Sequence, residues 1–97
     1  MKKIILTLLL LFSYNVYANN NFEVVQDKFR NFINNQDFKK AESLKDEYLK
    51  LANENLNNSS DDYTMVLHDI ADLYKHLTVF NKALDLYLEI LNIYKKL

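Results

Sequence analysis

Two histidines and an aspartate, His68, Asp72 and His76, recur at intervals of four residues in the second half of the sequence. On a helix this interval places successive side chains one turn apart on the same face, so each neighbouring pair has a spacing suited to metal binding. The two histidines are separated by about 12 Å of helical rise, too far for both to hold one ion easily. We therefore expect a solvated helix face here, with no bound metal or other cofactor.

Residues for other kinds of catalysis are scarce. The sequence contains no Gly and no Cys, which excludes glycine-rich phosphate loops, nucleophile elbows, thiol nucleophiles and disulfides. Ser59 and Ser60 stand among turn-forming residues and are better explained as helix caps. Asp61, Asp62 and Asp69 suit a helix start and a wet face better than acid–base work, which needs a sheltered pocket. We expect no enzymatic activity.

Composition and charge limit the fold and the class of partner. The absence of Gly and Pro in 97 residues predicts one small domain of long helices, joined by turns of Asn, Asp and Ser. Without Lys2 and Lys3, which belong to a predicted leader, 10 basic residues face 13 acidic ones and the net charge is −3. Such a surface offers no basic patch for nucleic acid or anionic lipid.

Apolar residues recur at helical spacing in four segments of the chain. The expected helices cover residues 22–34, 38–56, 61–77 and 79–97. Asp37 is a good N-cap for the second helix, and Ser59 with Asp62 resembles a capping box for the third. The predicted fold is therefore all-α, with two antiparallel helical hairpins at 22–56 and 61–97.

The second hairpin contains a motif of small and large residues. Four of them have the spacing of the first helix of a tetratricopeptide repeat, with conservative replacements: Leu67, Ile70, Ala71 and Tyr74. Ala83 and Tyr87 repeat the alanine-to-aromatic step of its second helix, whereas Lys95 replaces its late proline. Residues 64–97 therefore resemble one tetratricopeptide repeat, which implies a helical module that binds other proteins.

The motif has a physical reason. Ala71 and Ala83 are small residues where two antiparallel helices must approach closely. The large residues expected to fill the space between the helices are Tyr74, Phe80 and Tyr87.

The first hairpin looks like a degenerate copy of the second. Residues 37–41 align with 79–83 at a separation of 42, longer than the usual repeat of about 34 residues. This resembles the extended tetratricopeptide class of kinesin light chains and implies an α-α superhelix. Phe29 occupies a position that calls for a small residue, and Lys45 one that calls for an aromatic residue.

In tetratricopeptide proteins, the first helix of each repeat lines a groove that receives a peptide. The aligned groove positions are Met65, His68, Asp72, Lys75 and His76, with Gln26, Arg30 and Ile33 from the first repeat. Clamps for a C-terminal carboxylate carry basic and asparagine residues where His68 and Asp72 stand, so that ligand is not expected. We expect weak binding of a protein or peptide in a small groove of mixed charge, with ordinary solvated surface as the alternative.

The last predicted helix is unusually apolar. The face expected to pack on the core contains Phe80, Ala83, Leu84, Tyr87, Leu91 and Tyr94. A second set widens the apolar arc to roughly 220°, and comprises Leu86, Ile90, Ile93 and Leu97. Because the end of a helical solenoid normally presents a polar cap, we predict that this second set is an open apolar flank. It would either self-associate or dock a partner helix.

The N-terminus resembles a secretory signal peptide over residues 1–18. Lys2 and Lys3 are followed by an apolar run, and Val16-Tyr17-Ala18 forms a cleavage site. The apolar run is shorter than the ~20 residues of a membrane span. Frequent Asn, Lys and Ile indicate an AT-rich bacterial genome, so the product would be periplasmic or secreted. The alternative is an uncleaved leader that anchors the chain in the inner membrane.

These features predict an exported tetratricopeptide-like adaptor, with residues 19–97 as its domain. Two alternatives stay open. In the first, the chain is the N-terminal fragment of a longer repeat protein and has no independent function. In the second, it is a membrane-tethered subunit that retains its leader.

Overall fold

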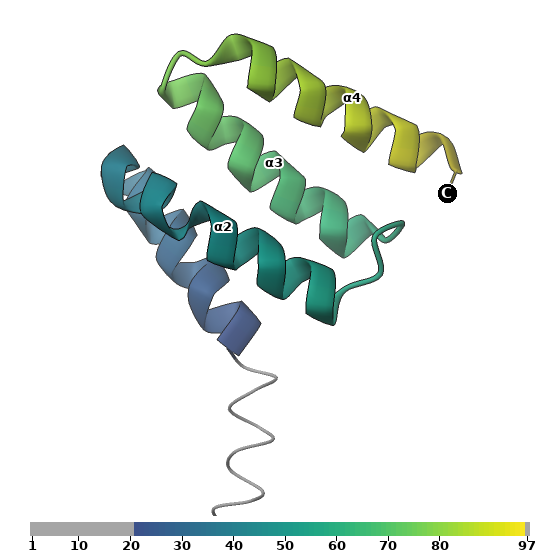
Figure 1. Ribbon diagram of the computed structural model, residues 1–97, viewed down its shortest axis with the longest axis horizontal. Coiled ribbons are helices and arrows are strands. Elements are labelled where there is room, and N and C mark those ends of the chain that lie inside the picture. The colour runs from purple at the N-terminus through teal and green to yellow at the C-terminus, as the bar shows by residue number, and fades with distance from the viewer. Residues whose placement is uncertain (1–20, 97) are drawn as a thin grey trace, which may run out of the picture.

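The computed structural model describes residues 21–96, and its regular structure is entirely helical there (Figure 1). Residues 21–34 are helical, followed by α2 (Phe38–Asn55), α3 (Asp61–His76) and α4 (Phe80–Lys96). The predicted all-α fold with helical hairpins is confirmed for these residues, and the helix bounds agree closely with those expected. The predicted leader, residues 1–18, and Leu97 lie outside the described residues.

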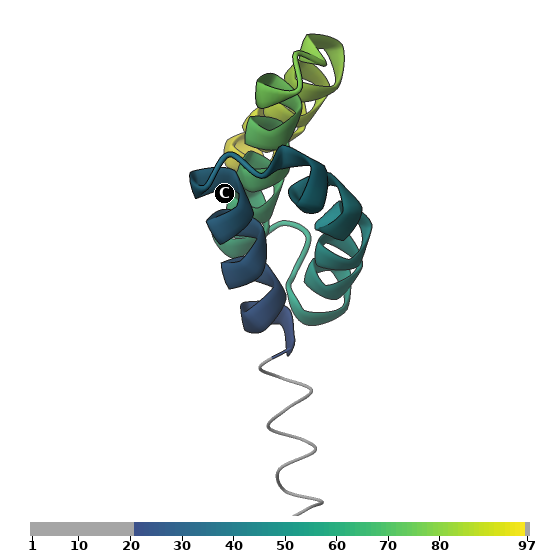
Figure 2. The same cartoon turned by 90° about the vertical axis from the view of Figure 1, so that its left-hand side faces the viewer.

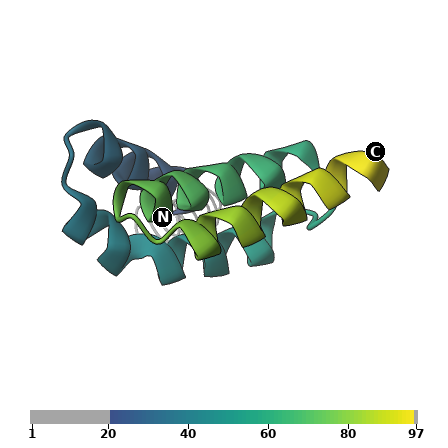
Figure 3. The same cartoon turned by 90° about the horizontal axis from the view of Figure 1, so that it is seen from above.

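The helices form two antiparallel pairs, which we call hairpin one (residues 21–55) and hairpin two (residues 61–96). Figure 2 shows the 21–34 helix and α2 running in opposite directions on either side of a short turn. Helix α3 packs against both α2 and α4, and α4 lies along α3 at the edge of the array (Figure 3). Thus α3 joins the two hairpins.

The turns inside the two hairpins have the same backbone geometry. In each, one residue after the helix has a left-handed conformation with φ of 60°: Gln36 and Thr78. The next residue donates its N–H to a carbonyl five positions earlier: Asp37 to Phe32 at 2.7 Å, and Val79 to Tyr74 at 2.8 Å. This is the Schellman arrangement that ends many helices. Equivalent residues are 42 apart, so the spacing found in the sequence is also a repeat of structure.

The caps differ in detail from the prediction. The Oγ of Ser60, not of Ser59, accepts a hydrogen bond from the Tyr63 N–H at 3.2 Å and caps α3. Asp37 stands at the cap position of α2, but its side chain makes no capping hydrogen bond. Its carboxylate instead lies 3.5 Å from Lys40 Nζ. Only the cap of α3 shifts, by one residue, whereas the cap position of α2 is the predicted one.

Small residues lie where helices meet, as predicted. Ala71 and Ala83 are both buried. Tyr74 and Tyr87 pack, partly buried, against the core. Phe80 was expected to join them, and this expectation is wrong, since 62% of its surface is exposed. It is the first residue of α4, on a side of that helix that faces away from the core.

Aromatic packing fills hairpin one. Phe29 and Tyr48 are fully buried, with ring centroids 5.0 Å apart. Phe29, at the position that calls for a small residue, is thus accommodated by a ring from α2. Lys45 stands where an aromatic residue was expected. Its Nζ donates to the Tyr74 hydroxyl at 2.9 Å and lies 5.0 Å from the centre of that ring, so α3 supplies the missing aromatic group.

The open side of α4 is not the one predicted. Ile90 is only 4% exposed and belongs to the core, while Leu86 and Ile93 pack against it. Four of the exposed residues come from the face expected to be buried: Phe80, Leu84, Leu91 and Tyr94. Leu88, which belonged to neither predicted set, is exposed as well. The apolar arc is wide enough to bury either half, and contact with α3 selects the half containing Ile90.

Candidate functional site

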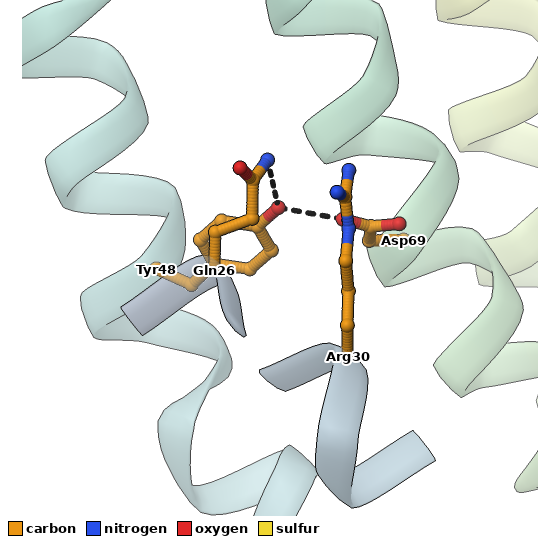
Figure 4. Close-up of polar contacts among 4 residues, drawn as sticks. All are labelled: Gln26, Arg30, Tyr48 and Asp69. Carbon is orange, nitrogen blue, oxygen red and sulfur yellow. Dashed lines mark hydrogen bonds and ion pairs between the residues drawn. The ribbon is translucent and has the colours of Figure 1, made fainter. Parts of the chain in front are cut away.

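A polar network joins the two hairpins and includes two of the predicted groove residues, Gln26 and Arg30 (Figure 4). Gln26 Nε2 donates a hydrogen bond to the Tyr48 hydroxyl at 3.0 Å, and that hydroxyl donates to Asp69 Oδ2 at 2.6 Å. Arg30 Nε donates to the same carboxylate oxygen at 2.9 Å. The four side chains come from the 21–34 helix, α2 and α3, so the network holds three helices together.

The electrostatics of the network favour a neutral phenol and a charged guanidinium. Burial and the hydrogen bond to Asp69 raise the pKa of Tyr48 well above its ordinary value. Burial alone would lower the pKa of Arg30, but the hydrogen bond and charge of Asp69 outweigh it, so this pKa is raised. Tyr48 is therefore a hydrogen-bond donor at neutral pH and is poorly suited to act as a base.

Asp69 was expected on a wet helix face and instead lies at the junction of the hairpins. Sequence periodicity did contain a signal for this. Asp69 is about 60° around α3 from Asp72, on the border between the exposed side and the buried side. A half-buried carboxylate at such a border needs partners, and Tyr48 and Arg30 supply them.

The predicted groove residues of α3 do share one side of the helix, an arc of about 100°. We call this side the α3 face; its residues are Met65, His68, Asp72, Lys75 and His76. Four of them are exposed, and Asp72 is half-buried. The His68 ring contacts Tyr87 of α4 edge-on, with centroids 5.6 Å apart. The His76 ring stacks on Phe38 of α2 at 4.6 Å. The two histidines thus border different neighbouring helices.

Two shallow hollows lie between the 21–34 helix and α3. One has a volume of about 220 Å³ and is lined by Phe29, Arg30, Ile33, Asn34, Asp69 and Asp72. The other, of about 380 Å³, is lined by Phe22, Glu23, Gln26, Asn55, Leu56, Asp62 and Met65. Five predicted groove residues therefore line a hollow, whereas His68, Lys75 and His76 line neither. The predicted groove residues therefore do not all line one hollow.

A third hollow was not expected from the sequence. Its volume is about 280 Å³, and it lies between α2 and α4, with Ile70 and Tyr74 of α3 among the lining residues. Lys45 and Lys82 place their Nζ atoms 5.0 and 5.5 Å from the Tyr74 ring centre. Helical geometry puts this hollow on the side of α3 opposite the α3 face. The lysines already contact the ring, so the hollow is part of the packing between helices.

Within residues 21–96, no three His, Asp or Glu side chains converge as metal ligands. None of the helices in that range is both long enough and apolar enough to cross a membrane. A comparison of the chain with protein-family models, with curated proteins and with solved structures finds no match. The assignment of a function therefore rests on the residues and geometry of this chain.

Proposed function

We propose that this chain is an exported, tetratricopeptide-like module that binds a segment of another protein on the α3 face. The observation that best supports the proposal is the duplicated hairpin: the left-handed residues Gln36 and Thr78, with the hydrogen bonds around them, recur at a spacing of 42. Such stacked hairpins are the repeating unit of α-α superhelices, which use their extended surfaces for binding.

The chemistry of the α3 face fits a polypeptide ligand. Lys75 and His76 can donate hydrogen bonds to backbone carbonyls, and the carboxylate of Asp72 can accept from backbone N–H groups. Met65, an exposed and flexible thioether, can contact apolar side chains of varied shape. The face is small and its charges are mixed, so binding should be weak and transient.

Export is part of the proposal because of the leader-like residues 1–18. Cleavage after Ala18 would release a domain beginning at Asn19 into the periplasm or the medium. N-terminal sequencing of the recovered protein tests this point. A chain that begins at Asn19 agrees with export, and one that keeps Met1 contradicts cleavage and favours a tethered subunit.

Site-specific photo-cross-linking tests the binding face. A benzophenone amino acid at Lys75 of the full chain, expressed in bacteria, should give one discrete adduct, to be identified by mass spectrometry. The same group at Glu47, exposed on α2, is the matched control and should give none. Asp72→Lys should abolish the adduct at position 75, whereas Glu42→Lys should leave it unchanged. Equal adducts from positions 47 and 75, or an adduct insensitive to Asp72→Lys, would contradict the proposal.

A further inference from the structure

Helix α4 carries a row of large apolar side chains along one side, which we call the α4 stripe. Its members are between 46 and 62% exposed: Phe80, Leu84, Leu88, Leu91 and Tyr94. On a helix these positions fall within an arc of about 120° and extend about 21 Å along the axis. None of them is charged. A patch of this kind on a small protein commonly marks a contact with another molecule.

The repeat shows that hairpin one buries part of the corresponding side of α2. Three residues of α2 lie 42 positions before members of the stripe: Phe38, Leu49 and Ala52. These three are wholly or partly buried in the core. The equivalents of Leu84 and Leu88 are Glu42 and Asp46, which are charged and exposed. Helix α3 packs against α2, and its His76 ring stacks on Phe38. Within residues 21–96, no helix occupies the corresponding place beside α4.

A second copy of the chain could meet the stripe in two ways. If copies stacked head to tail, the outer side of the 21–34 helix would take the place that α3 has beside α2. The 21–34 helix would then need apolar side chains like those that α3 buries, which include Val66, Ile70 and Leu73. Their equivalents 42 positions earlier are Val24, Lys28 and Asn31. Two of these three equivalents are polar, so head-to-tail stacking has no matching apolar surface. The surface that matches the stripe is the stripe itself.

An antiparallel pairing suits the order of residues along α4. The stripe is nearly symmetrical about residues 87–88, so Leu84 would lie opposite Leu91 of the second copy, and Phe80 near its Tyr94. Lys95 and Lys96 of the two copies would then lie at opposite ends, which avoids repulsion between like charges. The helix dipoles would also run in opposite directions, as is favourable for neighbouring helices. A parallel pairing would place the lysines side by side.

We propose that α4 is a dimerisation helix, with two copies of the chain paired antiparallel through the α4 stripe about a two-fold axis near Leu88. This goes beyond the proposed function, since it concerns a different surface and does not depend on a ligand at the α3 face. Helix α4 lies at the edge of the array, where a second copy can reach it (Figure 3).

The size of the stripe sets the expected strength of the dimer. The five side chains expose on the order of 500 Å², so a symmetrical contact would bury about 1,000 Å² in total, near the lower limit for a specific interface. Such an interface implies a dissociation constant of about 1–100 µM. The chain should therefore change from monomer to dimer over an accessible range of concentration.

Cysteine cross-linking tests the proposal, because the natural chain contains no Cys. Leu88→Cys in the full chain, treated with a short bis-maleimide, should give a covalent dimer as the main product. Val24→Cys is the matched control, since Val24 is 45% and Leu88 51% exposed, and it should give several-fold less. Adding Leu84→Asp and Leu91→Asp should abolish the Leu88→Cys dimer. Circular dichroism verifies that the variants remain helical, and Leu84→Asp alone serves if the double variant unfolds.

The orientation is tested by mixing single variants. In an antiparallel dimer, Leu84→Cys mixed with Leu91→Cys should cross-link several-fold more than either variant alone. Efficient cross-linking of each variant to itself would indicate a parallel pair and overturn the proposed axis. Cross-linking of Leu88→Cys with Val24→Cys would indicate head-to-tail stacking and overturn the dimer. Equal yields from Leu88→Cys and Val24→Cys, a monomer by sedimentation at about 100 µM, or a cross-link only to a different protein would overturn it as well.

Discussion

Hairpins one and two share a turn and a repeat spacing, but equivalent residues in them have different surroundings. Ala41 and Ala83 are both buried, as are Tyr48 and Ile90. Phe38, in contrast, is partly buried beneath His76 of α3, whereas its equivalent Phe80 is largely exposed. The positions facing the partner helix of the same hairpin therefore behave alike. The positions facing the next helix along the array differ, because only hairpin one has such a neighbour within the described residues.

The residues that join hairpin one to hairpin two also differ in chemistry from their equivalents in hairpin two. At the position of Tyr48, whose hydroxyl reaches Asp69, hairpin two has Ile90, which has no polar group. Arg30 likewise has Asp72 as its equivalent, with the opposite charge. Among residues 21–96, the polar junction thus lies between hairpin one and α3 and has no counterpart at α4. The two hairpins are copies in backbone geometry, while their outward surfaces suit different contacts.

The largest effect should come from removing a buried phenylalanine of hairpin one, in comparison with the exposed Phe80 of hairpin two. Phe29→Ala should lower the free energy of unfolding by about 3–5 kcal/mol, because it leaves a cavity beside the Tyr48 ring. That is most or all of the stability of so small a domain. Phe80→Ala, at low protein concentration where the chain is monomeric, should change it by no more than about 0.5 kcal/mol. Urea unfolding followed by circular dichroism measures both, and equal losses would contradict the burial pattern.

The second largest loss of stability should come from the polar junction between the hairpins. Asp69→Ala should destabilise the chain by about 2 kcal/mol, chiefly because the Tyr48 hydroxyl loses its acceptor. The ion pair with Arg30 adds little, since that side chain is 38% exposed. Asp72→Ala is the matched control and should have little effect. In a double-mutant cycle, Asp69→Ala should cost markedly less in a Tyr48→Phe background; an undiminished cost would show that the two groups are not coupled.

Alkaline pH should weaken hairpin one through Tyr48. Its pKa is raised in the folded chain by burial and by the bond to Asp69, so above about pH 10 the unfolded chain loses this proton while the folded chain keeps it. Below pH 10 the Tyr48 hydroxyl therefore does not change the free energy of unfolding with pH. Above pH 10 it lowers the free energy of unfolding by up to about 1.4 kcal/mol per pH unit. Urea titrations across this range should show a shallower fall for Tyr48→Phe. An unchanged slope would mean that Tyr48 ionises equally well in the folded chain.

The smallest effects should come from the shared turn. Gln36 and Thr78 both have a φ of 60°, a conformation that glycine adopts without strain. By removing the strain of positive φ, replacement by Gly should stabilise each hairpin by about 0.5–1 kcal/mol. The greater conformational entropy that Gly gives the unfolded chain offsets part of this gain. Thr78→Gly should gain more than Gln36→Gly, because β-branched residues tolerate positive φ least. A loss of stability at either position, measured by thermal unfolding, would argue against the Schellman geometry there.

Local features of the sequence predicted much of this fold. The apolar period located the helices, and runs of Asn, Asp and Ser located the breaks. Ala71 and Ala83 marked the helix contacts, and the alignment of residues 37–41 with 79–83 anticipated the repeated turn. Each of these depends on interactions within a few residues or within one helix pair, which a single sequence contains directly.

Contacts between distant segments decided the rest. Asp69 became a junction residue because Tyr48 and Arg30, 21 and 39 positions away, reach it in the folded chain. The pattern on α4 showed an apolar arc too wide for one contact, but not which half is buried, because rotation of a helix about its own axis leaves its periodicity unchanged. Packing against α3 set that rotation: it buried Ile90 and left Phe80, Leu84 and Leu91 exposed.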